Sequence, residues 1–147
     1  MNEKLQKPNR YADLKLLGKI AEVPADPQAA IIETFPNPHP RRDYIIRIDC
    51  PDFTSLCPVT GQPDFAKIEI EYVADARCIE TKSLKLYLAS YRNACSFNED
   101  VVNRILDDLA DASKPRWMKI IGRFAPRGGL ALTVTAEHTS KARNRRA

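Results

Sequence analysis

A cysteine and an aspartate seven residues apart could act together on an electrophilic carbon. Cys57 and Asp64 flank a loop, CPVTGQPD, that contains two prolines and one glycine. Proline and glycine limit the conformations of such a loop, which favours a fixed relation between thiol and carboxyl groups. The thiolate would attack the carbon, while Asp64 would supply or hold a proton as charge builds on the adjacent heteroatom. The alternative is an inert, buried cysteine beside a turn-forming aspartate.

A second cluster of charged residues follows in the segment ETKSLKLY. Lys82 and Lys85 lie three residues apart on the first turn of an expected helix, so they share a face and can bind one anion, helped by the helix dipole. Phosphate groups of a cofactor would suit them. The alternative is that Thr81 or Ser83 caps the helix and both lysines are solvated.

Two further segments could recognise a ligand. In SFNED, the Glu99 carboxylate could accept two N–H bonds from a purine-like edge while the nearby aromatic ring stacks on it. Alternatively, Ser96 and Glu99 form a capping box, or Asn98 is the N-cap. Arg127 lies in a PRGG turn, which suits an anion, although an ordinary hairpin loop has the same composition.

The hydrophobic pattern predicts the elements that position these residues. Ile68, Ile70 and Tyr72 alternate with charged residues, which predicts a strand with one solvated face. Apolar residues at i, i+3, i+4 and i+7 then predict two amphipathic helices. Strands followed by helices and strands predict an α+β domain with an antiparallel sheet and two helices on one face. The expected strands are residues 29–35, 44–48, 66–73, 117–124 and 130–136, and the expected helices are 82–93 and 98–112.

The excess positive charge lies at the C-terminal end of the chain. The 147 residues have a net charge of +4, but the first 140 hold 19 basic and 19 acidic groups. The domain organisation that we expect is a flexible extension at 1–10, a single catalytic domain at 11–138 and a basic disordered tail at 139–147. A neutral domain argues against direct nucleic-acid binding.

Composition excludes other classes of protein. No apolar run approaches the roughly 18 residues of a membrane span, and the first ten residues lack a signal-peptide segment. Four cysteines without a CxxC pair, and two histidines, offer no usual zinc spacing, so no metal is expected. Free thiols indicate a reducing, cytoplasmic location. Neither a G-x-G-x-x-G motif nor a P-loop is present, so a nucleotide cofactor must be held another way.

These motifs, in this order, resemble the short form of the NADPH-dependent 7-cyano-7-deazaguanine reductases, the nitrile reductases of queuosine biosynthesis. The resemblance covers residues 11–137. It implies the tunnelling fold, assembled from rings of subunits, as a homo-oligomer such as a decamer of two stacked pentamers. It is carried by ETFPN at 33–37, FTSLCP at 53–58, TGQPDFA at 60–66, KSLKLY at 82–87 and PRGG at 126–129.

The resemblance also implies roles for individual residues. Cys57 would add to the nitrile of 7-cyano-7-deazaguanine to give a thioimidate, and Asp64 would deliver protons to its nitrogen. Two hydrides from two NADPH molecules would then yield 7-aminomethyl-7-deazaguanine. The substrate-binding residues would be Ile79, Glu80, Thr81, Asn98 and Glu99, and the NADPH-binding residues Lys82, Lys85 and Arg127.

Two departures from the family pattern stand out. Asn98 replaces the usual histidine, and an amide cannot carry a proton near neutral pH. Thr81 replaces a common serine and retains the hydroxyl.

One rival interpretation is a related enzyme that forms an amidine on a nitrile-bearing tRNA base. The Lys82 and Lys85 pair argues against that enzyme. Another is a non-catalytic purine-binding module, against which the presence of Cys57 and Asp64 argues.

Overall fold

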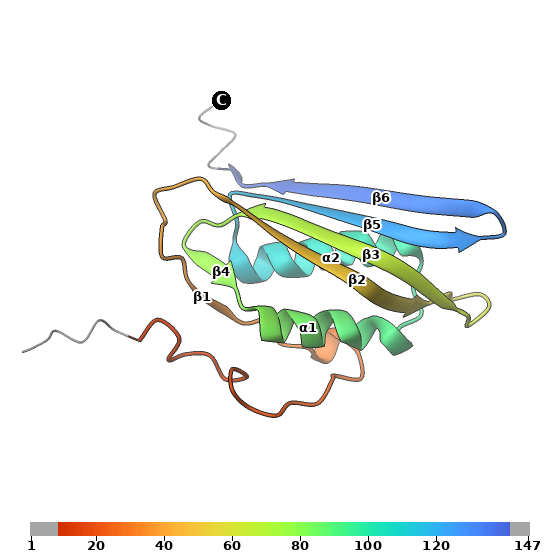
Figure 1. The fold of residues 1–147 in the computed structure, drawn as a ribbon, viewed down its shortest axis with the longest axis horizontal. Helices are drawn as coiled ribbons and strands as arrows, with labels where there is room; N and C mark the ends of the chain where they lie inside the picture. Colours follow the sequence, from red (N-terminus) through yellow and green to blue (C-terminus); the bar gives the residue numbers. More distant parts are fainter. Residues whose placement is uncertain (1–8, 142–147) are drawn as a thin grey trace, which may run out of the picture.

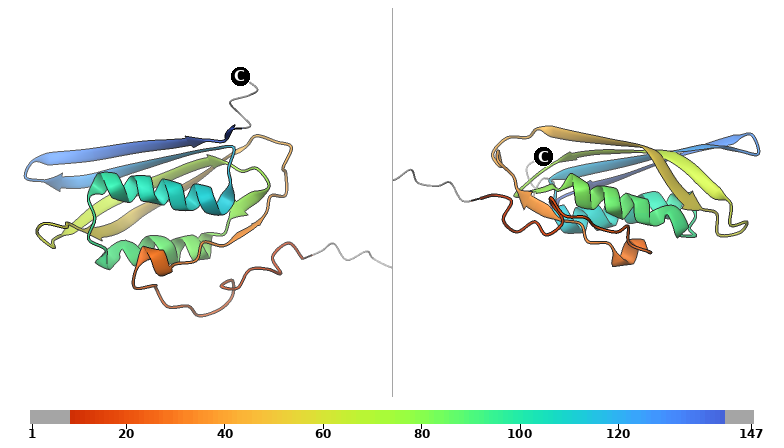
Figure 2. Two further views of the ribbon diagram at one scale, coloured as in Figure 1. Left: turned by 180° about the vertical axis from the view of Figure 1, so that it is seen from behind. Right: turned by 60° about the horizontal axis from the view of Figure 1, so that its bottom comes forward.

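A four-stranded antiparallel sheet and two helices form most of residues 9–141, the part of the chain that the computed structural model describes (Figure 1). The sheet order is β2-β3-β5-β6, and β1 pairs with β4 in a separate two-stranded sheet. Both helices lie on one face of the larger sheet (Figure 2), as the pattern predicted. The elements are η1 (Pro27–Ala29), β1 (Thr34–Pro36), β2 (Ile45–Leu56), β3 (Pro63–Val73), β4 (Arg77–Ile79), α1 (Thr81–Ala89), η2 (Ser90–Asn93), α2 (Asn98–Ser113), β5 (Trp117–Arg127) and β6 (Leu130–Thr139).

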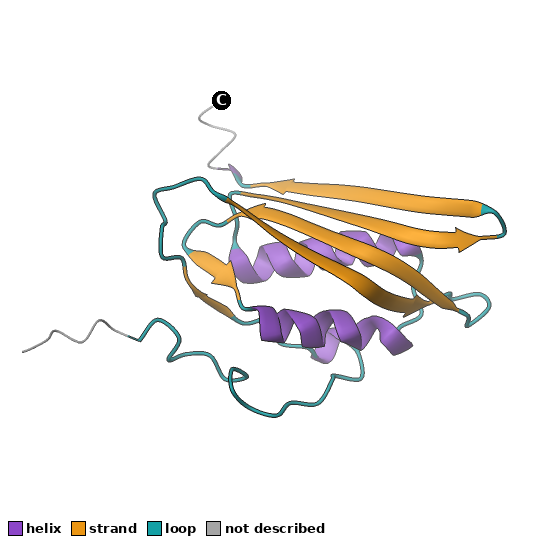
Figure 3. Ribbon diagram, in the orientation of Figure 1, coloured by secondary structure: helices purple, strands orange, loops and turns teal. Residues whose placement is uncertain are grey.

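The core lies between the sheet and the helices (Figure 3). Alternate residues of β3 face it, and Ile68 and Ile70 are fully buried there. The apolar stripe of α2 supplies Val102, Ile105 and Leu109, which are also fully buried. Because these side chains recur with helical spacing, α2 can bury one face and leave its acidic residues in solvent. The sequence pattern therefore predicted both elements correctly.

The opposite face of the sheet is charged. Glu69 forms ion pairs with Arg47 at 3.0 Å, Lys67 at 3.2 Å and Arg123 at 3.1 Å. Lys67, followed by Arg123, lowers the pKa of Glu69 from its ordinary value. This arrangement confirms that the second face of β3 is charged, but Glu69 itself is buried among its ion pairs rather than solvated.

Other local predictions were wrong or incomplete. Residues 29–35 were expected to form a strand, but the chain makes a 3-10 turn at η1 and only the short β1. The strand expected at 44–48 continues through Leu56, with a register irregularity between Cys50 and Phe53. No pattern in the sequence indicated β4, which exists because its three residues pair with β1.

The ends of the chain are described only in part. Residues 1–8 and 142–147, on which most of the expected extension and tail fall, lie outside the described residues. Thr139 ends β6 and pairs with Trp117 of β5. Within residues 9–141 no helix is long and apolar enough to cross a membrane.

Candidate active site

Cys57 begins the loop that connects β2 to β3. Its backbone N–H donates to the carbonyl oxygen of Gln62 at 2.8 Å, and the N–H of Gly61 donates back to the Cys57 carbonyl at 2.9 Å. Gly61 has a φ of +70°, which a residue with a side chain adopts only with strain. Two backbone hydrogen bonds and one glycine thus close the loop and hold the backbone of Cys57 in place.

The same loop is attached to the start of α2. The Leu56 N–H donates to the Ala94 carbonyl at 3.0 Å, and the Ser96 N–H donates to the Leu56 carbonyl at 3.1 Å. These bonds pair the end of β2 with the connection that leads into α2. The first turn of α2, with Asn98 and Glu99, is therefore at the Cys57 end of the sheet.

Asp64 lies opposite Ser55 in the β2–β3 ladder, and both residues are buried. Residues directly opposite each other in an antiparallel pair point to the same face, and Cys57 follows Ser55 by two residues on that face. Arg127, the last residue of β5, donates to Asp64 Oδ1 at 2.7 Å. The Asp64 carboxylate is therefore both buried and ion-paired at the end of the sheet.

The surroundings of Cys57 favour its thiolate. They lower the pKa of the thiol from its ordinary value of 9.0 to about 7. The largest cause is a hydrogen bond from the Thr60 hydroxyl, followed by the backbone N–H groups of Thr60 and Val59 and by the Arg127 guanidinium. About half of such a thiol is ionised at neutral pH, which makes Cys57 a competent nucleophile.

Ser55 is a polar residue close to Cys57 that the sequence motifs did not identify. Ser55 is fully buried, and its Oγ has no hydrogen-bond partner among the described residues. Asn98 Oδ1 is likewise buried without a partner in the part of the chain that the structure describes. An unpaired buried polar atom costs about 1–3 kcal/mol, so both are free to bind a ligand or water. Ser55 lies two residues before Cys57, and that spacing on a strand is the signal that could have identified it.

The second group of expected site residues lies around the start of α1. The Glu80 carboxylate caps this helix, accepting from the N–H of Lys82 at 2.7 Å and of Ser83 at 2.8 Å. The structure therefore contradicts the suggestion that Thr81 or Ser83 caps α1. It also contradicts the suggestion that Asn98 is the N-cap of α2 or that a capping box forms there. The N-cap of α2 is Phe97, without a side-chain bond.

An N-terminal arm covers the start of α1. The Glu33 carboxylate accepts from the N–H of Lys15 at 2.7 Å and of Leu16 at 3.2 Å. Lys82 Nζ donates to the carbonyl oxygens of Leu16 and Lys19. Lys82 is thus occupied by its own chain, whereas Lys85 is exposed.

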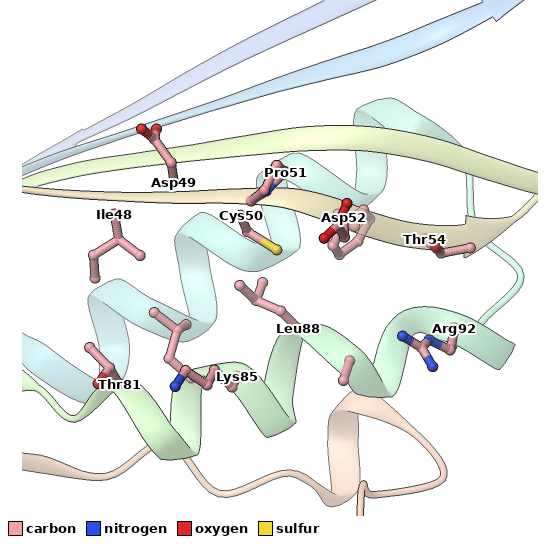
Figure 4. Close-up of a pocket in the computed structure, with 13 residues that line it drawn as sticks. Ile48, Asp49, Cys50, Pro51, Asp52, Thr54, Thr81, Lys85, Leu88 and Arg92 are labelled. Atoms are coloured by element: carbon pink, nitrogen blue, oxygen red, sulfur yellow. The ribbon is translucent and has the colours of Figure 1, made fainter.

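Two cavities border the α1 end. One, of about 400 Å³, lies between β2 and α1 and includes Lys85, Arg92 and the half-buried Cys50, whose pKa burial raises (Figure 4). The other, of about 510 Å³, includes Ile79 and Glu80. Thr81 borders both.

The two groups of site residues do not meet within one chain. α1 begins beside β4, whereas the loop between β2 and β3 lies at the far end of the sheet (Figure 1). The nine residues of α1 alone span about 13 Å along that direction. One chain therefore brings together Cys57, Asp64, Arg127 and the start of α2, but not the residues around Glu80 and Lys85. Among residues 9–141, no group of three or more His, Cys, Asp or Glu side chains could hold a metal ion.

The fold and this site define an α+β protein with an activated thiol beside a buried, ion-paired carboxylate. Comparison with known proteins identifies the family. The family model for the QueF-like protein matches residues 63–143, a range that includes Asp64, both helices and Arg127. The chain belongs to the QueF-like family.

Similar curated proteins are named NADPH-dependent 7-cyano-7-deazaguanine reductase. The protein of Magnetococcus marinus is 55% identical over 113 residues, 77% of this chain and 88% of its own length. That of Bacteroides thetaiotaomicron is 50% identical over 125 residues, 85% of this chain and 83% of its own length. A solved structure of the archaeosine synthase QueF-Like in the apo form matches with a TM-score of 0.63 and 20% identity, over 68% of this chain and 98% of that one. At this identity the match shows the fold alone.

Proposed function

We propose that this protein reduces the nitrile of 7-cyano-7-deazaguanine to an aminomethyl group with NADPH, a step of tRNA queuosine biosynthesis. The observation that carries the proposal is the Cys57 thiol, whose pKa is lowered to about 7, at the same sheet end as the Asp64 carboxylate. Relatives with the reductase name cover most of the chain.

The residues of the Cys57 site suit nucleophilic addition to a nitrile. The thiolate forms a C–S bond to the nitrile carbon, and one π bond of the C≡N group breaks toward nitrogen. The proton that the Cys57 thiol loses passes through the Asp64 carboxylate to that nitrogen, and the product is a thioimidate with no atom lost. Because the thiolate adds to the nitrile first, the four-electron reduction can proceed as two successive hydride transfers. The Ser55 hydroxyl and the Asn98 amide provide further polar groups at this end of the sheet.

When bound, NADPH would supply two hydrides in total, one from each of two molecules. The residues that fit its phosphates are Lys85, which is exposed beside a cavity of about 400 Å³, and Lys82 and Arg127. The Lys82 and Arg127 donors are bonded to acceptors of the same chain, so phosphate binding there requires an exchange of partners.

Substrate binding completes the site from two chains. We assign Glu99 and Asn98 to one side of the purine, and Ile79, Glu80 and Thr81 of a neighbouring subunit to the other. The separation of these groups within one chain supports this arrangement. Among residues 9–141, β2 and β6 are the outer strands of the four-stranded sheet, and an outer strand presents backbone groups that can pair with another copy. We therefore propose a homo-oligomer, two stacked pentameric rings, built from the catalytic domain at 11–138.

The location of the protein and the ends of the chain complete the proposal. The four cysteines are free, which suits the reducing cytoplasm. The extension at 1–10 and the basic tail at 139–147 are assigned no part in the chemistry. No nucleic acid is bound directly, because the charge of the first 140 residues balances.

The main rival is amidine formation on a nitrile-bearing tRNA base. It would begin with the same thioimidate but has no need of a cation for cofactor phosphates, so the exposed Lys85 argues for the reductase. A non-catalytic purine-binding module has no need of a thiol with a lowered pKa.

Cofactor stoichiometry tests this choice. With 7-cyano-7-deazaguanine present, we expect two NADPH molecules oxidised for each aminomethyl product, by absorbance and mass spectrometry. Lys85→Ala should raise the KM for NADPH, while Lys114→Ala, an exposed lysine at the end of α2, should not. A Cys57 adduct that forms while NADPH is never consumed would support the amidine-forming rival.

A further inference from the structure

Arg127 contacts three residues at the β2–β3 connection, all of them more than sixty residues away from it in the sequence. Its Nη1 donates to Asp64 Oδ1 at 2.7 Å, and its Nη2 donates to Gln62 Oε1 at 2.7 Å and to Thr60 Oγ1 at 3.3 Å. The Asp64 side chain is 8% exposed and that of Arg127 is 40% exposed. The planar guanidinium presents its donors in a fixed fork, so it fixes the positions of these acceptors relative to one another.

The contacted residues belong to the machinery around the thiol. The Gln62 carbonyl oxygen also accepts the backbone N–H of Cys57, and Thr60 is the residue that most lowers the pKa of the Cys57 thiol. Arg127 therefore contacts two residues of the loop that determines where Cys57 lies. A residue that served only to bind a cofactor phosphate would not need these three acceptors of its own chain.

We propose that Arg127 is a positioning residue that holds the 57–62 loop and the Asp64 carboxylate in fixed relation to the Cys57 thiol before any substrate or cofactor binds. This inference rests on the proposed role of Cys57 as the nucleophile. It adds to the phosphate-binding role proposed above, because the contacts exist in the chain alone.

The charges around Cys57 give this role a measurable consequence. The elements that meet its loop contribute Arg127 from β5 and the acidic residues Asp64 from β3 and Glu99 and Asp100 from α2. Arg127 is the cation among them. Removing it takes away a direct stabiliser of the thiolate and loosens the Thr60 hydroxyl, so the pKa of Cys57 should move back toward 9.0.

The experiment follows Cys57 alkylation by iodoacetamide against pH, without NADPH or nitrile. Peptide mass spectrometry separates Cys57 from the other cysteines. For the unchanged protein we expect the rate to rise with a midpoint near pH 7. Arg127→Ala should raise the midpoint and lower the rate at pH 7 at least threefold. The control is Arg123→Ala, whose arginine pairs with Glu69 at 3.1 Å on the other face and should leave the profile unchanged.

Hydrogen exchange of the Cys57 and Gly61 amides gives a second readout. It should accelerate several-fold in Arg127→Ala and also in Gln62→Ala, which removes one acceptor of the guanidinium while leaving its charge. Arg127→Lys should give an intermediate midpoint, because the charge remains and the fork is lost. An Arg127→Ala protein with an unchanged alkylation profile and unchanged exchange would overturn the proposal, even if its NADPH affinity fell. Since neither assay uses nitrile or NADPH, their outcome is separate from that of the proposed reduction.

Discussion

Gly122 of β5 lies against Val102 of α2, and it can test how tightly α2 is held. A Cβ built on Gly122 would lie 2.5 Å from Val102 Cγ2 and 2.9 Å from Phe124 Cε2. Real Cβ atoms do not approach other atoms so closely, so Gly122→Ala must push α2 or the Phe124 ring away from the sheet. Overpacking of a closed core costs about 1–3 kcal/mol, and replacing a strand glycine returns up to about 1 kcal/mol. We expect Gly122→Ala to lower the free energy of unfolding by about 1–2 kcal/mol.

The assay is urea unfolding of each variant at one fixed protein concentration. Val102→Ala alone should cost about 2 kcal/mol, because it removes buried methyl groups. In the double variant Gly122→Ala/Val102→Ala, the added Cβ occupies the space that the Val102 side chain vacates. The loss in the free energy of unfolding should therefore be smaller than the sum of the two single losses by about 1 kcal/mol or more. Thr133→Ala, at an exposed position of β6, is the control and should change stability little. A Gly122→Ala protein as stable as the unchanged one, or strictly additive costs, would refute this account of α2 packing.

Three further substitutions test the polar contacts of the site. Glu80→Ala removes the α1 cap and should cost about 1 kcal/mol in urea unfolding, whereas Glu80→Gln, which keeps an acceptor, should cost less; equal costs would contradict the capping role. Ser55→Ala removes a buried hydroxyl without a partner and should leave thermal stability unchanged or raise it; a loss above about 1 kcal/mol would show a hidden partner. Lys82→Ala should release the arm at Leu16 and speed its cleavage in limited proteolysis, and an unchanged cleavage rate would count against that contact.

Elements that bury one face over many residues could be predicted from the sequence. The helical spacing of Val102, Ile105 and Leu109 identified α2, since only one face of that helix enters the core. The alternation through Ile68 and Ile70 identified β3 for the same reason. The short β1 and β4 have no such pattern, because their pairing depends on contacts more than forty residues apart, such as Thr34 with Ile79.

The candidate site was predictable in its residue types but not in its connections. The proline and glycine residues around Cys57 and Asp64 suggested a constrained loop, and the structure closes that loop with two backbone hydrogen bonds. The contact of Arg127 with Asp64 depends on the register of β3 with β5 and on the irregularity after Phe124, neither of which composition reveals. The Glu80 cap was missed because a shorter serine or threonine is the commoner cap.

The most direct test of the central claim is the covalent state of Cys57. The protein is mixed with 7-cyano-7-deazaguanine without NADPH and its intact mass is measured. Addition to a nitrile loses no atoms, so the mass should rise by that of one whole substrate molecule per chain, with the modified peptide containing Cys57. Cys57→Ala should show no increase, and Cys50→Ala should behave as the unchanged protein. An unchanged mass, or an adduct that persists in Cys57→Ala, would contradict the assignment of Cys57 as the nucleophile.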